Sequence, residues 1–223
     1  PSDGGPVAVP SQDMVLGIYY LTQERPGVTG EGKSFKNLNE AILAYENGVI
    51  TLHSRIKVRV TKTIDGEVKS GIVESTLGRF LFNEIIPQDL GFVDRTIPGN
   101  ELLLEVDFLV GKKQNKQILE KVINTHGATV TAEVLDKIKA TGYKYSTRAA
   151  MTVSISEMTV PPQKPQMIQE AQDTVDKITK NFKRGLITEE ERYKEVVETW
   201  KETDDTLTRA LLDGLDKYNN IFM

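Results

Sequence analysis

The chain has 223 residues, enough for one large domain or two small ones, and its 39% apolar and 27% charged residues are ordinary for a soluble globular protein. The sequence has no cysteine and only His53 and His126, which excludes disulfides and disfavours thiolate or histidine metal sites. No apolar run is long enough to span a bilayer, and the net charge of −4 argues against a dedicated nucleic-acid-binding surface.

The first third of the chain mixes loops with one clear helix. The apolar run Val15–Leu21 fits a buried helix or a buried strand, and periodicity does not separate the two. The glycines of residues 27–32 indicate a loop. A helix follows, with Asn37 as N-cap, Glu40 completing a capping box and Gly48 as the residue that ends it.

The middle of the chain reads as a β-hairpin followed by short helices. Residues 55–63 alternate apolar and polar, Asp65-Gly66 is a hairpin turn, and residues 67–76 form the returning strand. Residues 75–87 turn helical before Pro87. Two amphipathic helices are expected at residues 114–125 and 131–140, the second ending at Gly142.

The last third has the spacing of a coiled coil. Apolar residues recur every three or four positions from Ile168 to Phe182, and again from Tyr193 to Leu215. Gly185 supplies the turn, and Thr188 with Glu191 forms a second capping box. The fold class predicted is therefore α+β: an irregular mixed domain of short helices and strands, followed by a long antiparallel two-helix coiled-coil hairpin with helices at about 164–183 and 188–215.

Residue patterns typical of catalysis are scarce. There is no Walker loop, no nucleophile elbow and no nucleophile beside a base. The glycine loop at 27–32 lacks the lysine-serine ending of a phosphate loop and reads as a surface loop. The three glutamates 189–191 suit a helix first turn, where the macrodipole favours acids, and Asp204-Asp205 suits a solvated helix face.

Two features favour a functional interpretation. Lys112, Lys113 and Lys116 place positive charge at a helix start, where the dipole disfavours it; a functional anion contact and simple solvation both remain open. At the hairpin turn, Leu186 and Ile187 lie beside basic residues, which suits either a partner site or a local cap against Phe182.

Several stretches, in order along essentially the whole chain, resemble the β′ subunit family of bacterial RNA polymerase. They are Val9–Gly17 (VPSQDMVLG), Thr76–Arg79 with Phe82–Glu84 and Ile86-Pro87, Thr141–Ala149 (TGYKYSTRA), Met158–Pro161, and Gly185–Thr188 with Glu191–Tyr193. The resemblance implies a pore domain at residues 1–146 and a funnel domain at 147–223, whose coiled coil corresponds to the rim helices. Together these wall the secondary channel, through which nucleoside triphosphates enter and the RNA 3′ end is extruded on backtracking.

The resemblance also implies a fragment of a larger cytoplasmic enzyme, a view that the start at Pro1 without methionine and the apolar end at residues 221–223 support. DNA-directed RNA polymerase is a nucleotidyltransferase, but this stretch lacks the catalytic aspartate loop, the bridge helix and the trigger loop. It is therefore expected to be inactive alone and to hold no cofactor, with Mg and Zn expected elsewhere in the whole subunit. The alternative is a free-standing coiled-coil adaptor without catalytic activity.

Site residues and partners follow from the same resemblance. Lys112 and Lys113 match a lysine pair lining the channel, and Gln12 matches a position near the inner end of the pore. Gre-type cleavage factors and related channel regulators are expected to dock at the hairpin tip, formed by Lys183, Arg184, Gly185, Leu186, Ile187 and Thr188, with Leu186 as the main contact. The other expected partners are the alpha, beta, omega and sigma subunits, with DNA reached only through the whole enzyme. The guanosine-tetraphosphate site of some relatives is not carried over, because Lys194-Glu195 departs from its pattern.

Overall fold

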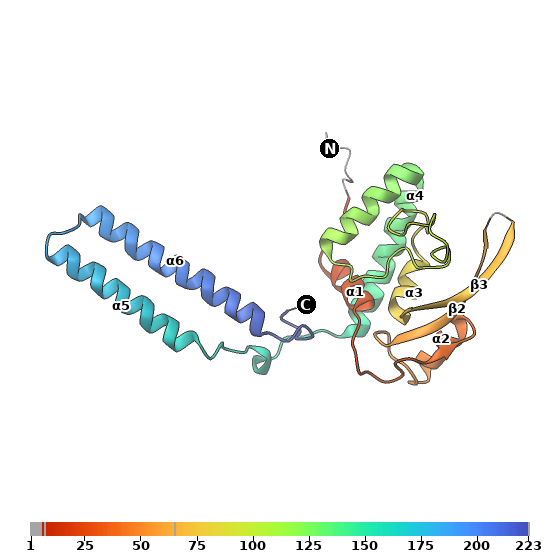
Figure 1. The fold of residues 1–223 in the computed structure, drawn as a ribbon, viewed down its shortest axis with the longest axis horizontal. Coiled ribbons are helices and arrows are strands. Elements are labelled where there is room, and N and C mark those ends of the chain that lie inside the picture. Colours follow the sequence, from red (N-terminus) through yellow and green to blue (C-terminus); the bar gives the residue numbers. More distant parts are fainter. Residues whose placement is uncertain (1–5, 7, 65, 223) are drawn as a thin grey trace. The chain divides into compact units, whose positions relative to one another are not determined.

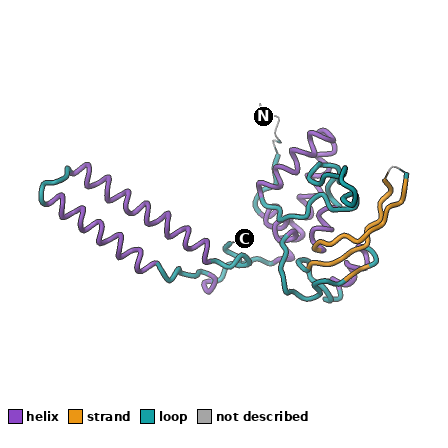
Figure 2. The backbone as a smooth tube through the Cα atoms, in the orientation of Figure 1, coloured by secondary structure: helices purple, strands orange, loops and turns teal. Residues whose placement is uncertain are grey.

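The computed structural model describes Pro6 and residues 8–64 and 66–222, and it divides the chain into two compact units, residues 1–151 and 152–223. Figure 1 traces the first unit from red to green and the second in blue, and Figure 2 separates helices from strands in the same view. The position 146/147, where the sequence analysis divides the chain, lies within the last turn of a long helix. The α+β class, with a helical hairpin after a mixed domain, is confirmed.

The first unit begins with α1 (Asp13–Thr22), which settles the open question of the apolar run in favour of a helix. It is followed by β1 (Ser34–Phe35) and α2 (Leu38–Glu46). The Asn37 side chain accepts the Glu40 amide at 2.9 Å, as in a capping box. The Glu40 carboxylate accepts the amide of Lys36, whereas in a capping box it would accept the amide of the N-cap residue, Asn37. Gly48 ends the helix with a φ of 70°, as predicted.

The first unit also contains a three-stranded sheet of order β1-β2-β3. β2 (Arg55–Ile64) and β3 (Glu67–Thr76) pair antiparallel with Ile64 opposite Glu67, which confirms the hairpin. Of the predicted turn, Gly66 has a φ of 83°, and Asp65 lies outside the described residues. The short strand β1, which no sequence pattern predicts, runs parallel to the start of β2.

Two helices complete the unit. α3 (Leu77–Asn83) follows β3 directly, capped by the Thr76 side chain, as the helical tendency before Pro87 predicts. The element α4 (Lys112–Ala149) joins two helical segments across a kink at Gly127, where φ is 77°, and these segments correspond to the two helices predicted after residue 110. The predicted stop at Gly142 is wrong: this glycine is buried inside α4 against Met14, and the helix ends at Ala149 with Ala150 as its C-cap.

The core of the first unit lies between these elements. It is built from buried aliphatic and aromatic side chains of α1, the inner face of the β2–β3 hairpin, α3 and α4. Ile18, Ile56, Phe82 and Ile118, one from each of these elements, are fully buried. The side chains that the sequence analysis marks as functional all stand outside this core.

The second unit contains a single 3₁₀ turn (Ile155–Glu157) and the helical hairpin of α5 (Lys164–Lys183) and α6 (Glu189–Gly214). The hairpin, its turn at Gly185 with a φ of 72°, and the Thr188–Glu191 capping box are confirmed. Ala171 and Ile178 are buried on α5, whereas no described residue of α6 is. The seam is therefore a narrow apolar stripe, and most of the hairpin surface remains exposed.

Candidate functional site

The lysine pair stands on the first turn of α4, and its backbone is anchored to α1. The Val110 amide donates to the Thr22 hydroxyl at 3.0 Å, deep in the core. Gly111 is the N-cap, and its amide donates to the Gln114 side chain at 3.2 Å. The fully buried Asn115 donates from Nδ2 to the Gly111 carbonyl oxygen. These bonds fix where α4 begins, and so fix the point from which the lysines project.

The positive charge of these lysines is not balanced by an acidic side chain in the described part of the chain. Lys112, Lys113 and Lys116 are exposed, and no ion pair to any of them occurs in the described part of the chain. The first turn contains no acid, although acids are what a helix N-terminus favours. The fold does not need these cations for its own stability, which leaves them free to attract an anion.

Gln12, the third channel candidate, lies at the N-terminus of α1. It is exposed, and its φ of 49° with ψ of −127° is a conformation that a residue with a side chain rarely adopts. Its carbonyl oxygen accepts the Leu16 amide, whereas its side chain caps nothing. Backbone strain of this kind is a feature of functional positions more often than of ordinary ones.

The structure does not bring Gln12 and the lysine pair together. Thr22, at the end of α1, is bonded to Val110, just before α4. Gln12 is at the opposite end of α1, where Met14 contacts Gly142. The ten residues of α1 rise roughly 15 Å, so Gln12 and the start of α4, where the lysines stand, lie near opposite ends of α1.

The hairpin tip is a tight turn whose apolar residue faces solvent. The amides of Gly185 and Leu186 donate to the carbonyl oxygens of Phe182 and Asn181 at 2.8 and 3.0 Å, which closes the end of α5. Leu186 is 68% exposed, so it does not act as a local cap against Phe182. Ile187 is half-buried.

Basic side chains surround that leucine. Lys183 ends α5, Arg184 follows it, and both are exposed. On the other side of the turn, Thr188 caps α6, and the Arg192 guanidinium lies over the Phe182 ring at 5.6 Å. The tip therefore combines an exposed aliphatic side chain with positive charge on a rigid turn.

The acidic clusters have structural roles. Glu189 pairs with Arg192, and that hydrogen bond lowers the pKa of the Glu189 carboxyl. Glu191 accepts the Thr188 amide at 2.7 Å, which lowers its pKa in the same way. Asp204 and Asp205 are exposed on α6. Across the described residues, no group of three acids or histidines is placed to hold a metal ion.

The glycine loop at 27–32 also has a structural explanation. The Gly27 amide donates to the Glu31 carboxylate at 2.7 Å, so the loop's own acid occupies a donor that a phosphate would need. Gly30 lies against Ile50, where a Cβ would come within 2.5 Å of the side chain. The loop is thus closed by its own contacts, as the surface-loop interpretation predicts.

An ion network around the buried Arg79, which sequence reasoning missed, holds α3 to the end of α1. The Arg79 guanidinium donates to Glu24 at 2.9 Å, to Asp107 at 3.1 Å and to the Thr22 carbonyl oxygen at 3.0 Å. Arg55 binds the same Glu24 at 3.0 Å. The only sequence signal for this network is Arg79 itself, an arginine directly after the buried Gly78.

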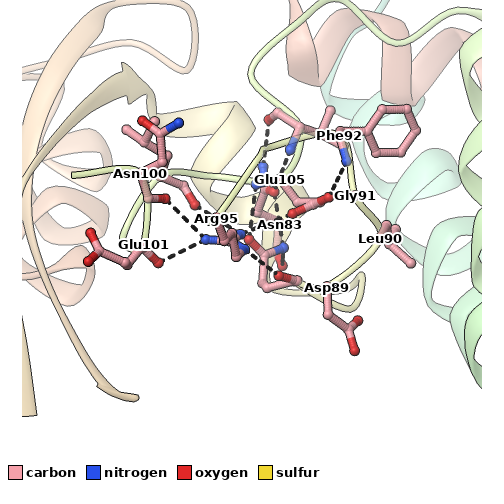
Figure 3. Close-up of polar contacts among 12 residues, drawn as sticks. Asn83, Asp89, Leu90, Gly91, Phe92, Arg95, Asn100, Glu101 and Glu105 are labelled. Atoms are coloured by element: carbon pink, nitrogen blue, oxygen red, sulfur yellow. Dashed lines mark hydrogen bonds and ion pairs between the residues drawn. The ribbon is translucent and has the colours of Figure 1, made fainter. Parts of the chain in front are cut away.

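A second network makes the long loop between α3 and α4 rigid, and Figure 3 shows its centre. Asn83 exchanges two hydrogen bonds with the backbone of Val106, at 2.7 and 3.0 Å. Glu105 is buried and accepts both the Phe92 amide and the Arg95 guanidinium. Because this loop leads into Val110, its rigidity contributes to the fixed position of the lysine pair.

The family described as RNA polymerase Rpb1, domain 3, matches residues 1–158. The whole chain is 70% identical to the DNA-directed RNA polymerase subunit beta′ of Lachnoclostridium phytofermentans, 56% to that of Clostridium acetobutylicum and 55% to that of Acetivibrio thermocellus. The chain spans 18–19% of the length of these relatives. None of the helices described here is both long and apolar enough to cross a membrane.

Proposed function

Because the chain belongs to the family of RNA polymerase Rpb1, domain 3, we propose that it forms part of a secondary-channel wall in the largest subunit of a bacterial RNA polymerase. In this proposal residues 1–146 form the pore domain and residues 147–223 form the funnel domain. The observation that carries it is the pair of sites without an internal role: unpaired lysines at a fixed helix start, and an exposed leucine on a rigid turn.

The lysine pair has the electrostatic properties of a guide for triphosphates. Lys112 and Lys113 project from a helix N-terminus whose own partial charge is positive, so the two effects add. A nucleoside triphosphate or the RNA 3′ end would be attracted over a distance of about one Debye length, roughly 8 Å at physiological salt. The strained Gln12 would contact the same ligands at the inner end of the pore.

The hairpin tip has the properties of a docking site. Leu186 is exposed, its amide is bonded to the Asn181 carbonyl oxygen at the end of α5, and it follows the exposed Lys183 and Arg184 along the turn. An anchor of this kind fits a partner with an apolar pocket and an acidic rim, and in this family Gre-type cleavage factors are the partners we propose. The alpha, beta, omega and sigma subunits would complete the enzyme, and Mg and Zn would be held by other parts of the subunit. Nothing favours the free-standing adaptor, since the whole chain aligns inside a longer subunit in each of these relatives.

The docking half is tested with Leu186→Asp in the intact polymerase. This variant removes an aliphatic contact with the factor and adds a charge, so it should weaken binding of a Gre-type factor at least about tenfold, while promoter-driven synthesis persists. Leu212→Asp is the matched control, because Leu212 is also exposed but lies near the other end of α6. Equal binding by the two variants would remove the tip assignment.

The channel half is tested separately with Lys112→Ala and Lys113→Ala together. Elongation at limiting triphosphate should slow several-fold, more at low salt than at high salt, with little change at saturating triphosphate. Lys177→Ala with Lys180→Ala removes the same charge from exposed positions on α5 and should leave elongation unchanged. Identical rates for both double variants would contradict the guiding role.

A further inference from the structure

The outer edge of β2 is only partly covered. β1 pairs with β2 at Lys57 and Val58 alone, and the Lys57 amide points outward to the Lys33 carbonyl oxygen at 2.9 Å. Alternate residues of an antiparallel strand direct their peptide groups to opposite edges, so Thr61 and Thr63 point outward as Lys57 does. In the described structure no strand lies beside these two residues.

A groove of about 450 Å³ runs along this uncovered edge. Five consecutive residues of β2, numbers 58–62, line it. Consecutive side chains of a strand point to opposite faces, so a hollow that touches all five borders the backbone edge as well as the inner face, to which Val58, Val60 and Lys62 point. The groove begins at Leu38, directly after β1, and its far wall is formed by α3 and the loop that follows.

The floor of the groove is apolar and the β2 side is positively charged. Leu38 and Val60 line it and are only partly buried, so an apolar side chain placed there would meet open aliphatic surface. Lys62 lines it as well, is half-buried and makes no ion pair in the part of the chain that is described. Burial and the neighbouring Arg95 guanidinium lower the pKa of the Lys62 amine, with Glu105 opposing them.

That positive charge is not neutralised from within. Glu105, whose charge opposes the lowering of the Lys62 pKa, is bonded at 3.0 Å to Arg95 and also accepts the Phe92 amide. Glu84 lies on the far wall and is exposed to solvent. A half-buried ammonium group beside an apolar floor is most favourable when a carboxylate is brought to it.

We propose that the β2 edge receives an extended segment from elsewhere in the assembled polymerase, which adds as a strand beside Thr61 and Thr63. This segment places an aliphatic side chain against Leu38 and Val60 and a carboxylate against Lys62. An uncovered strand edge with unpaired peptide groups is a template for another strand, and β1 already occupies its first positions. The inference rests on membership of the polymerase family and not on the channel or docking roles.

Amide hydrogen exchange of the purified, assembled polymerase tests this inference, read residue by residue by electron-transfer fragmentation. The Thr61 and Thr63 amides should exchange at least about 100-fold more slowly than in an open chain, because the added strand accepts them. Exchange of both at near open-chain rates would overturn the proposal. The Val60 and Lys62 amides, which point toward β3, report whether the hairpin itself is intact.

The charge requirement is tested with Lys62→Glu and Lys62→Met, the second of which keeps the apolar stem. Lys62→Glu should speed exchange at Thr61 and Thr63 by at least about tenfold, and Lys62→Met by less, with Val60 unchanged in both. Lys57→Glu is the control, since Lys57 is exposed on the opposite face of the same strand. If Lys62→Glu and Lys57→Glu gave equal protection, the edge would be covered by something other than an acidic strand, and the inference would be wrong.

Discussion

Replacing Gly17 with alanine should force apart the two helices that organise the first unit. A Cβ at Gly17 would lie 1.8 Å from the carbonyl oxygen of Gly142 and 2.8 Å from the amide nitrogen of Ser146. A carbon and an oxygen normally approach no closer than about 3.3 Å, so the backbones must separate by more than about 1 Å. At the same crossing, a Cβ on Gly142 would lie 2.6 Å from the carbonyl oxygen of Met14, so both helices need a glycine there.

The cost can be set against a small gain. Overpacking of a close-packed contact costs about 1–3 kcal/mol, and separation of the helices also loosens Ile18 and Leu21, which are fully buried. Alanine is a better helix former than glycine by about 1 kcal/mol, which offsets part of this. We expect a net loss of about 2 kcal/mol, which lowers the Tm of the first unit by roughly 4–8 °C.

Scanning calorimetry of the chain measures this effect, because it resolves the transitions of the two units. Gly214→Ala is the matched control: Gly214 is also helical, and a Cβ there meets nothing within 4 Å. That variant should keep the wild-type Tm or raise it slightly. A Gly17→Ala protein with the same Tm as Gly214→Ala would refute the argument that backbone contact of α1 and α4 requires glycine.

Two further variants test buried polar groups of the same unit. Burial lowers the pKa of His53 to about 4; the nearby Arg25 guanidinium adds to this, and the hydrogen bond between Nδ1 and the Gln23 carbonyl oxygen opposes it. Since the folded pKa lies below the unfolded value of about 6.5, the free energy of unfolding should fall by up to roughly 3 kcal/mol as pH drops from 6.5 to 4. Urea unfolding of His53→Gln should not show this pH-dependent loss. Arg79→Met leaves Glu24 and Asp107 without their buried partner and should cost about 2–4 kcal/mol in urea at pH 7; a cost below about 1 kcal/mol would contradict the structural role of the network.

Elements with local signals could be predicted from the sequence. The cap at Asn37, the hairpin turn at Gly66 and the capping box at Thr188 all depend on residues within four positions of one another. The heptad-like spacing predicted the helical hairpin, because a seam between two helices leaves a periodic trace in the sequence. Such patterns carry their own geometry and need no knowledge of the rest of the fold.

The failures share a physical cause, which is contact between distant segments. Gly142 has the local appearance of a helix stop, but it is required inside α4 by the approach of Met14, more than a hundred residues earlier. β1 is too short to leave any periodicity and exists because Lys33 bonds to Lys57. The role of Glu105 depends on Arg95 and on the Phe92 amide, and no spacing rule relates the three.

The stretches that carry the family resemblance divide into two physical kinds. Gly17, Gly78 and Gly142 are close-contact positions, and Arg79 and Asn83 hold buried networks, so the fold itself accounts for them. They identify the family strongly because packing tolerates few alternatives there, and for the same reason they say little about what the surface does.

Lys112, Lys113 and Leu186 belong to the other kind. They are exposed and make no side-chain bond or ion pair within the described residues, so the fold does not account for their identity. Substituting them should therefore leave the Tm within about 1–2 °C of wild type, because surface changes of this sort usually alter stability by no more than about 0.5 kcal/mol. An effect on factor binding or elongation at unchanged Tm can then be assigned to the site itself. If the Tm fell together with the activity, these residues would be needed for the fold instead.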